Sequence, residues 1–163
     1  MRPSIRRWPN DSDPHQSCIE PLTYTARPNA VAKSAAVQAS RAPLPPIVCA
    51  DVNPDALAAA QKNASAASVD DAIVFERADV AALTPRWPVA TLVTNPPYGE
   101  RLDPPELDRL YRDMARAFEG LRGWRVVVLS GNPALARSIR RKPAVMHRLW
   151  NGALETRLLR YDM

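Results

Sequence analysis

The stretch ATLVTNPPYGERL, residues 90–102, decides the fold prediction. Its first part, residues 90–94, is short and rich in β-branched residues, which predicts a strand. The Asn-Pro-Pro sequence at residues 95–97 ends that strand, because a proline fixes its own φ and keeps the residue before it extended. Tyr98 and Gly99, the first glycine of the chain, come next. The stretch therefore predicts a strand that ends in a stiff corner.

Strand and helix signals alternate on both sides of this corner. Apolar runs predict strands, the last of them fully buried, at 47–51, 72–76, 90–94 and 124–130. Asn-Pro caps and helical spacing predict helices at about 54–67, 106–119 and 133–141. Asn151-Gly152 predicts a hairpin turn. This order predicts an α/β fold with an open, mostly parallel sheet, helices on both faces and a C-terminal antiparallel hairpin.

Residues 1–46 differ from the rest of the chain. They hold eight of the 17 prolines and few large apolar residues. We expect them to be a Pro-rich, largely irregular segment, with one folded domain at 47–163. Within that domain, Trp124 and Trp150 are expected in the core.

Composition limits the class of protein. No apolar run is long enough to span a bilayer, and the N-terminus lacks the apolar core of a secretory signal. Cys18 and Cys49 have no metal-ligand spacing, which favours free thiols in a cytoplasmic protein. Residues 1–99 hold 9 Lys+Arg and 9 Asp+Glu, and residues 100–163 hold 13 and 8. The basic C-terminal part is compatible with a nucleic-acid partner or with a solvated surface.

Polar residues gather where the predicted strands end. Asp51, Asp79, Asn95 and the turn at residues 130–132 each follow a strand or a strand-like run. The carboxyl ends of parallel strands share one edge of a sheet, where ligands bind. We therefore expect the functional site at this edge.

The corner itself has the chemistry to hold an amine. The Asn95 side chain and the Pro96 carbonyl are two acceptors on a stiff backbone, and an exocyclic amino group has two N–H donors. Pro97 fixes the corner further, and Tyr98 can stack on the ring that carries the amine. Such an arrangement suits an sp² amine acting as a nucleophile.

Four motifs in order resemble a known family. TNPPYGERL, ADVNPDALAAAQKNA, LSGNPALA and LWNGALETRLLRYD resemble S-adenosylmethionine-dependent amino-methyltransferases of the 23S rRNA guanine N2-methyltransferase type, a methylase family usually found with a THUMP domain. The resemblance covers about residues 47–163. It implies a Rossmann-like methyltransferase sheet and S-adenosylmethionine as cofactor.

The resemblance also implies roles for individual residues. Asp51 would bind the cofactor ribose hydroxyls, and Asp79 would lie by its adenine amino group. Asn95 and the Pro96 carbonyl would hold the target amine next to the cofactor, and Tyr98 would stack on a flipped-out guanine. The partner implied is RNA, reached through the basic C-terminal part. Arg137, Arg140, Arg141 and Lys142 are candidate phosphate contacts, while Asn151-Gly152 is expected to act only as a turn.

One family element is missing from the sequence. The family carries a glycine-rich cofactor loop after its first strand, yet this chain has no glycine before Gly99. Residues 22–26, LTYTA, are the only candidate for that strand. Three alternatives stay open: an active enzyme completed by a partner chain, a non-catalytic remnant that at most binds RNA, and a methyltransferase of DNA adenine or protein glutamine.

Overall fold

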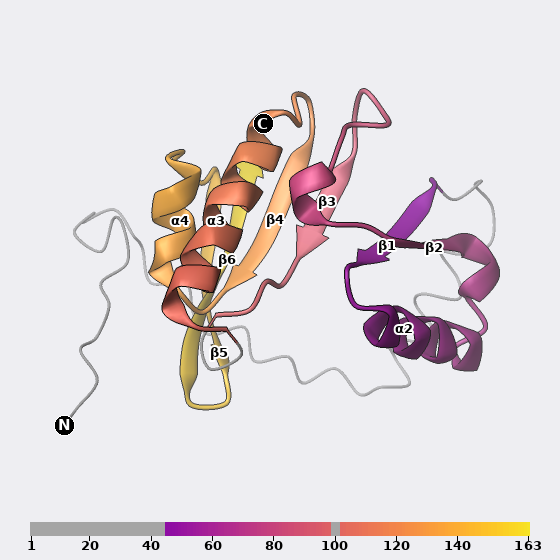
Figure 1. The fold of residues 1–163 in the computed structure, drawn as a ribbon. Coiled ribbons are helices and arrows are strands. Elements are labelled where there is room, and N and C mark those ends of the chain that lie inside the picture. The colour runs from indigo at the N-terminus through magenta and orange to yellow at the C-terminus, as the bar shows by residue number, and fades with distance from the viewer. Residues whose placement is uncertain (1–44, 99–101) are drawn as a thin grey trace. The chain divides into compact units, whose positions relative to one another are not determined.

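The computed structural model describes residues 45–98 and 102–163 (Figure 1). These residues form two compact units. The first unit contains residues 45–79. The second unit contains the described residues from Val80 to the C-terminus. The predicted first strand, residues 22–26, and the segment 1–44 lie outside the described residues.

The first unit is a parallel strand pair with one helix. Strand β1 (Ile47–Asp51) pairs with β2 (Ile73–Arg77), and α2 (Pro54–Ala66) connects them, followed by the short 3₁₀ turn η1 (Asp70–Ala72). The helix begins as predicted, because the Asn53 side chain accepts a hydrogen bond from the Asp55 N–H at 2.9 Å and Pro54 takes the first helical position. Among its described side chains only Ala64 is buried.

The second unit contains a four-stranded sheet in the order β3-β4-β6-β5. Its strands are β3 (Thr91–Thr94), β4 (Arg125–Ser130), β5 (Val145–Asn151) and β6 (Leu154–Asp162), and its helices are α3 (Pro104–Glu119), α4 (Pro133–Ile139) and the 3₁₀ turn η2 (Val80–Ala82). Strands β3 and β4 are parallel, whereas β6 is antiparallel to both of its neighbours. The α/β class and the C-terminal antiparallel hairpin are therefore confirmed.

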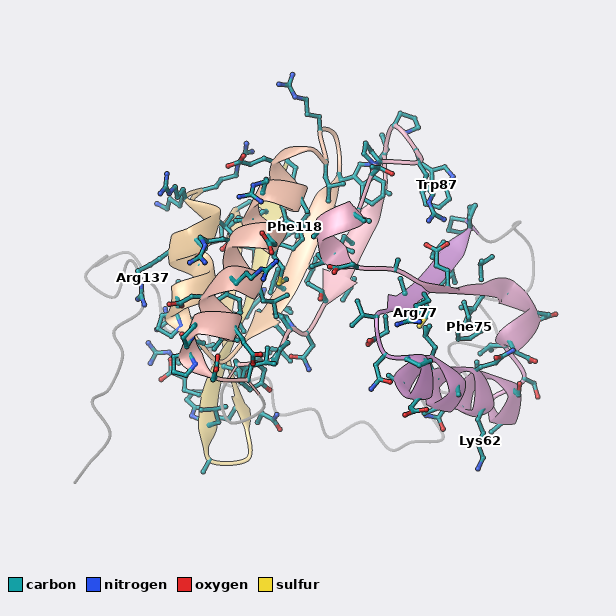
Figure 2. The ribbon with its side chains drawn as sticks, viewed as in Figure 1. Lys62, Phe75, Arg77, Trp87, Phe118 and Arg137 are labelled. Carbon is teal, nitrogen blue, oxygen red and sulfur yellow. The ribbon has the colours of Figure 1, made fainter. Side chains whose placement is uncertain are left out.

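Helices α3 and α4 cover one face of this sheet (Figure 1). The apolar face of α3 supplies two of the three largest fully buried side chains, Tyr111 and Phe118, the second of which is labelled in Figure 2. Strand β4 alternates buried Val126 and Val128 with partly exposed Val127 and Leu129. The expectation of a fully buried β4 was thus wrong, because the described helices of this unit cover only one face of it.

The two tryptophans expected in the core have different surroundings. Trp124 is 6% exposed, and its indole N–H donates to the Trp87 carbonyl at 2.8 Å. Trp150 is 59% exposed near the tip of the β5–β6 hairpin, so that prediction was wrong. Trp150 pairs with Glu155, which is two residues beyond the level at which β4 ends.

The hairpin forms as predicted, but its turn is shifted by one residue. Asn151 pairs with Leu154, which leaves Gly152 and Ala153 as the two loop residues. Gly152 has φ +63°, and a glycine at the first loop position is typical of a type II′ turn. Asn151 is therefore the last residue of a strand, and its side chain is available for contacts outside the turn.

Four strand edges have no partner in the described part of the chain. Strands β1 and β2 pair only with each other, and β3 and β5 are the outer strands of the four-stranded sheet. An unpaired strand edge carries free N–H and C=O groups that accept another strand. Within the described residues, no strand occupies any of these edges.

Candidate active site

The Asn-Pro-Pro-Tyr corner follows directly from the end of β3. Thr94, the last residue of β3, pairs with Val128 in β4. Asn95 is exposed, Pro96 is buried, and Pro97 and Tyr98 are half-buried. The Asn95 side chain is therefore exposed to solvent, while the backbone just before it is paired with β4.

Helix α3 holds the corner through Tyr111. This side chain is fully buried in the core, and its hydroxyl donates to the Pro97 carbonyl at 2.8 Å. The Pro97 carbonyl is not part of a helix or a strand ladder, and the buried Tyr111 hydroxyl supplies its hydrogen-bond donor. The hydrogen bond ties the corner to the rigid core of the second unit.

Two further elements contact the Tyr98 ring. A methyl group built on Gly131, in the turn after β4, would lie 2.5 Å from Tyr98 Cδ2, so only glycine leaves room for the ring. On the hairpin, Asn151 Nδ2 donates to the Tyr98 hydroxyl at 3.1 Å. The ring is therefore held by residues from two segments distant in sequence.

The acceptors that would receive an amine are open. Within the described residues, neither the Asn95 side chain nor the Pro96 carbonyl forms a hydrogen bond. The corner thus combines satisfied supporting groups with unsatisfied polar groups at its exposed side. These two groups are therefore able to accept hydrogen bonds from a ligand or from water.

The turn at the end of β4 is closed by its own side chains. The Ser130 hydroxyl donates to the Asn132 carbonyl at 2.9 Å, and the Asn132 side chain accepts from the Ala134 N–H at 2.9 Å. Ser130 is fully buried. These polar groups form hydrogen bonds within the turn itself. The turn therefore contributes to the corner through Gly131, which lies against the Tyr98 ring.

In the first unit, Asp51 ends β1. Its Oδ1 accepts from the Asn53 N–H at 2.8 Å, and Arg77 Nε donates to the Val52 carbonyl at 3.0 Å. These bonds fix the turn between β1 and α2. The carboxylate is exposed, and its second oxygen remains an acceptor, which suits a pair of ribose hydroxyls.

Asp79 is exposed at the end of the first unit, two residues after β2. The predicted candidates are thus divided between the units: Asp51 and Asp79 in the first, Asn95 to Tyr98 in the second.

Cys49 is a free thiol, and the described residues contain no cluster that could hold a metal ion. Nor is any described helix both long and apolar enough to cross a bilayer.

Comparison with protein families places the chain in one family. The model of the RMKL-like, methyltransferase domain family matches residues 15–160. The chain belongs to this family. The match includes the corner, β1 and the terminal hairpin, and it begins within the proline-rich segment.

Relatives of this methyltransferase domain are larger proteins. The chain is 41% identical over 129 residues to a ribosomal RNA large subunit methyltransferase K/L from Syntrophotalea carbinolica, covering 74% of this chain and 18% of that protein. It is 37% identical over 131 residues to a protein of the same name from Aeromonas salmonicida, covering 69% and 18%. The chain therefore spans about a fifth of the length of these relatives.

A solved structure shares the fold. The protein titled "SMU.472, a putative methyltransferase complexed with SAH" superposes with a TM-score of 0.72 at 27% identity, covering 82% of this chain and 36% of that one. The Rossmann-like methyltransferase fold expected from the four motifs is thus confirmed.

Sequence reasoning missed the residues that support the corner. The helical spacing of residues 106–119 does not distinguish Tyr111 from its apolar neighbours, and Asn151 was expected to act only as part of a turn. Gly131 gave one signal, since the chain has only five glycines and this one lies at a strand end. Its contact with Tyr98 depends on the pairing of β3 with β4, which no local pattern encodes.

Proposed function

We propose that this methyltransferase domain transfers a methyl group from S-adenosylmethionine to the exocyclic N2 amine of guanine in ribosomal RNA. One observation carries the proposal: the Asn95 side chain and the Pro96 carbonyl are open acceptors on a corner that Tyr111 anchors to the core. The names of the relatives support RNA as the substrate class. The N2 atom as target rests on the resemblance of TNPPYGERL.

The corner acts by orienting the amine. Asn95 Oδ1 and the Pro96 carbonyl accept hydrogen bonds from its two N–H groups, which leaves the nitrogen lone pair free to face an electrophile. The cofactor, when bound, would supply an electrophilic methyl group on a sulfonium, and the methylated amine would lose one proton to water. Stacking on Tyr98 holds the flipped base while this occurs.

Cofactor binding is assigned to three residues. Asp51 accepts from the ribose hydroxyls, because its second carboxylate oxygen is an open acceptor on a fixed turn. Asp79 would bind the adenine amine, and Asn95 would contact the cofactor near its methyl group. Asp51 is the last residue of β1, and Asp79 comes two residues after β2.

RNA binding is assigned to the basic C-terminal part. Arg137, Arg140, Arg141 and Lys142 are exposed at the end of α4. Clustered cations of this kind bind phosphates without reading sequence. The unpaired edges of β1 and β3 would accept a further strand, either from residues outside the described part or from a partner chain.

A second candidate function is a remnant that binds RNA without catalysis. It is favoured by the lack of any glycine before Gly99 and by the single buried apolar side chain, Ala64, among the described residues of the first unit. Such a chain would retain RNA and transfer no methyl group.

One experiment separates these functions. The full chain is incubated with labelled S-adenosylmethionine and, in parallel, unmodified ribosomal RNA, DNA or a glutamine peptide. We expect label in RNA, and a loss of at least about 100-fold in Asn95→Ala, because the amine loses an orienting acceptor. Asn63→Ala, an exposed residue of α2, is the matched control and should keep full activity. Label in DNA or peptide instead would contradict the proposal. RNA retention without label would favour the remnant.

A further inference from the structure

The β5–β6 hairpin extends beyond the end of β4. Ser130, the last residue of β4, pairs with Arg157, which in turn pairs with Arg148. Asn151 and its partner Leu154 lie three residues further along, about 10 Å at the usual rise of a strand. Because β5 runs parallel to β4, the tip lies at the carboxyl end of the sheet (Figure 1).

The tip contacts the corner through one side chain. Asn151 Nδ2 donates to the Tyr98 hydroxyl at 3.1 Å, although the two residues are 53 positions apart. The type II′ turn needs glycine only at Gly152, so an asparagine at 151 is not required by the turn. The residue type at this position therefore calls for another explanation.

The opposite constraint on the ring comes from Gly131. Three ring atoms of Tyr98 lie within 2.5 to 3.0 Å of where a Gly131 side chain would begin. Gly131 has no left-handed φ, so its lack of a side chain is explained by the close approach of the ring. Tyr98 is thus packed at its ring and bonded at its hydroxyl.

We propose that Asn151 is a positioning residue that, together with Gly131, fixes the plane of the Tyr98 ring for stacking of the target base. This inference rests on the proposed function for its consequence in methyl transfer. A ring already fixed before binding loses little freedom when a base stacks on it, and the amine then meets Asn95 in the reactive orientation. The hairpin acts through Tyr98 and does not touch the reacting atoms.

The first readout does not depend on activity. Tyrosine ring signals of the full chain are recorded by NMR with ring-labelled tyrosine, and Tyr98 is assigned by its loss in Tyr98→Phe. We expect Asn151→Ala to increase the motion of the Tyr98 ring. Asn151→Asp should preserve its order, because a carboxylate accepts a hydrogen bond from the hydroxyl. Gly131→Ala should shift the Tyr98 signals, since the added methyl occupies the place of the ring.

Matched controls separate positioning from general disturbance. Leu154→Ala changes the residue paired with Asn151 and so tests the hairpin without removing the contact. Gly120→Ala adds the same methyl where the nearest atom is 3.4 Å away. Neither control should alter the Tyr98 ring signals.

The second readout is kinetic. With unmodified ribosomal RNA, Asn151→Ala should lower kcat about 10-fold and change KM for RNA less than about threefold, because orientation rather than affinity is lost. In a Tyr98→Phe background the same change should have no further effect, since the shared contact is already absent.

Unchanged Tyr98 ring signals in Asn151→Ala would overturn the inference. A double variant whose loss of kcat is the product of the losses in Asn151→Ala and Tyr98→Phe would also overturn it. A wild-type chain that methylates nothing would overturn the proposed function instead. The ring signals would then decide the inference alone.

Discussion

The two units are built from similar elements but differ in what they bury. The second unit packs α3 and α4 on its sheet and contains 13 of the 14 buried apolar residues found in the described chain. The first unit contains one, Ala64, while Ile47 and Val74 are 42% and 57% exposed. Parallel strands normally have both faces covered, and a two-stranded sheet is rarely stable alone. The corner therefore rests on a formed core, whereas the described part of the first unit supports the Asp51 turn with a single buried side chain.

The largest expected contrast lies between the two phenylalanines of the chain (Figure 2). Phe118 is fully buried in the second unit, and Phe75 is half-buried in the first. Phe118→Ala should cost about 3–5 kcal/mol of unfolding free energy, because it leaves a cavity. Phe75→Ala should cost about 1 kcal/mol or less. Denaturation followed by tryptophan fluorescence measures both, and equal losses would break the comparison.

A pH titration sharpens the contrast further. Burial raises the pKa of Tyr161, in the core of the second unit, to about 12 from an ordinary 10.0. As pH rises, this tyrosine ionises at a lower pH in the unfolded chain than in the folded one. Its contribution to the free energy of unfolding is therefore complete below pH 10 and is lost as pH rises toward 12. The loss should reach about 2–3 kcal/mol. Tyr161→Phe should remove this part of the pH dependence, measured by denaturation between pH 9 and 12. An unchanged pH profile in Tyr161→Phe would contradict the burial of its hydroxyl.

The smallest expected effect compares two buried hydroxyls of the second unit. Tyr111 donates to the Pro97 carbonyl, whereas the Tyr161 hydroxyl forms no hydrogen bond within the described residues. At pH 7, Tyr111→Phe should cost about 1 kcal/mol, because it leaves a carbonyl unsatisfied. Tyr161→Phe should be neutral or stabilising. The same denaturation assay measures both losses of unfolding free energy. A larger loss in Tyr161→Phe than in Tyr111→Phe would disprove the role of Tyr111 as the anchor of the corner.

Local signals predicted the elements of both units equally well. Asn53 and Pro54 begin α2, and Asn132 and Pro133 begin α4, because caps and prolines act within one helical turn. The strand limits agree with the expected runs to within one residue at β1, β2 and β3. The corner was also found from sequence, since its proline pair is a local feature.

Burial and long-range contacts could not be predicted in this way. Trp124 and Trp150 look alike in sequence, yet only the packing of helices on the sheet decides which is covered. Likewise, Asn151 reaches Tyr98 because the hairpin turn is centred one residue later than the Asn-Gly signal implied. Both outcomes depend on strand order and register, which are properties of the whole sheet.

The measurement that tests the account most directly is amide hydrogen exchange of the full chain, with and without S-adenosylhomocysteine. Without ligand, we predict that amides of β1 and β2 exchange at least about 100-fold faster than those of β4 and β6, because the described residues of the first unit bury only Ala64. At about 100 times its dissociation constant, the ligand should slow exchange at β1 and the start of α2 up to about 100-fold, and Asp51→Ala should lose that gain. Amides of β1 that are as slow as those of β4 without ligand, or that do not respond to it, would contradict the account.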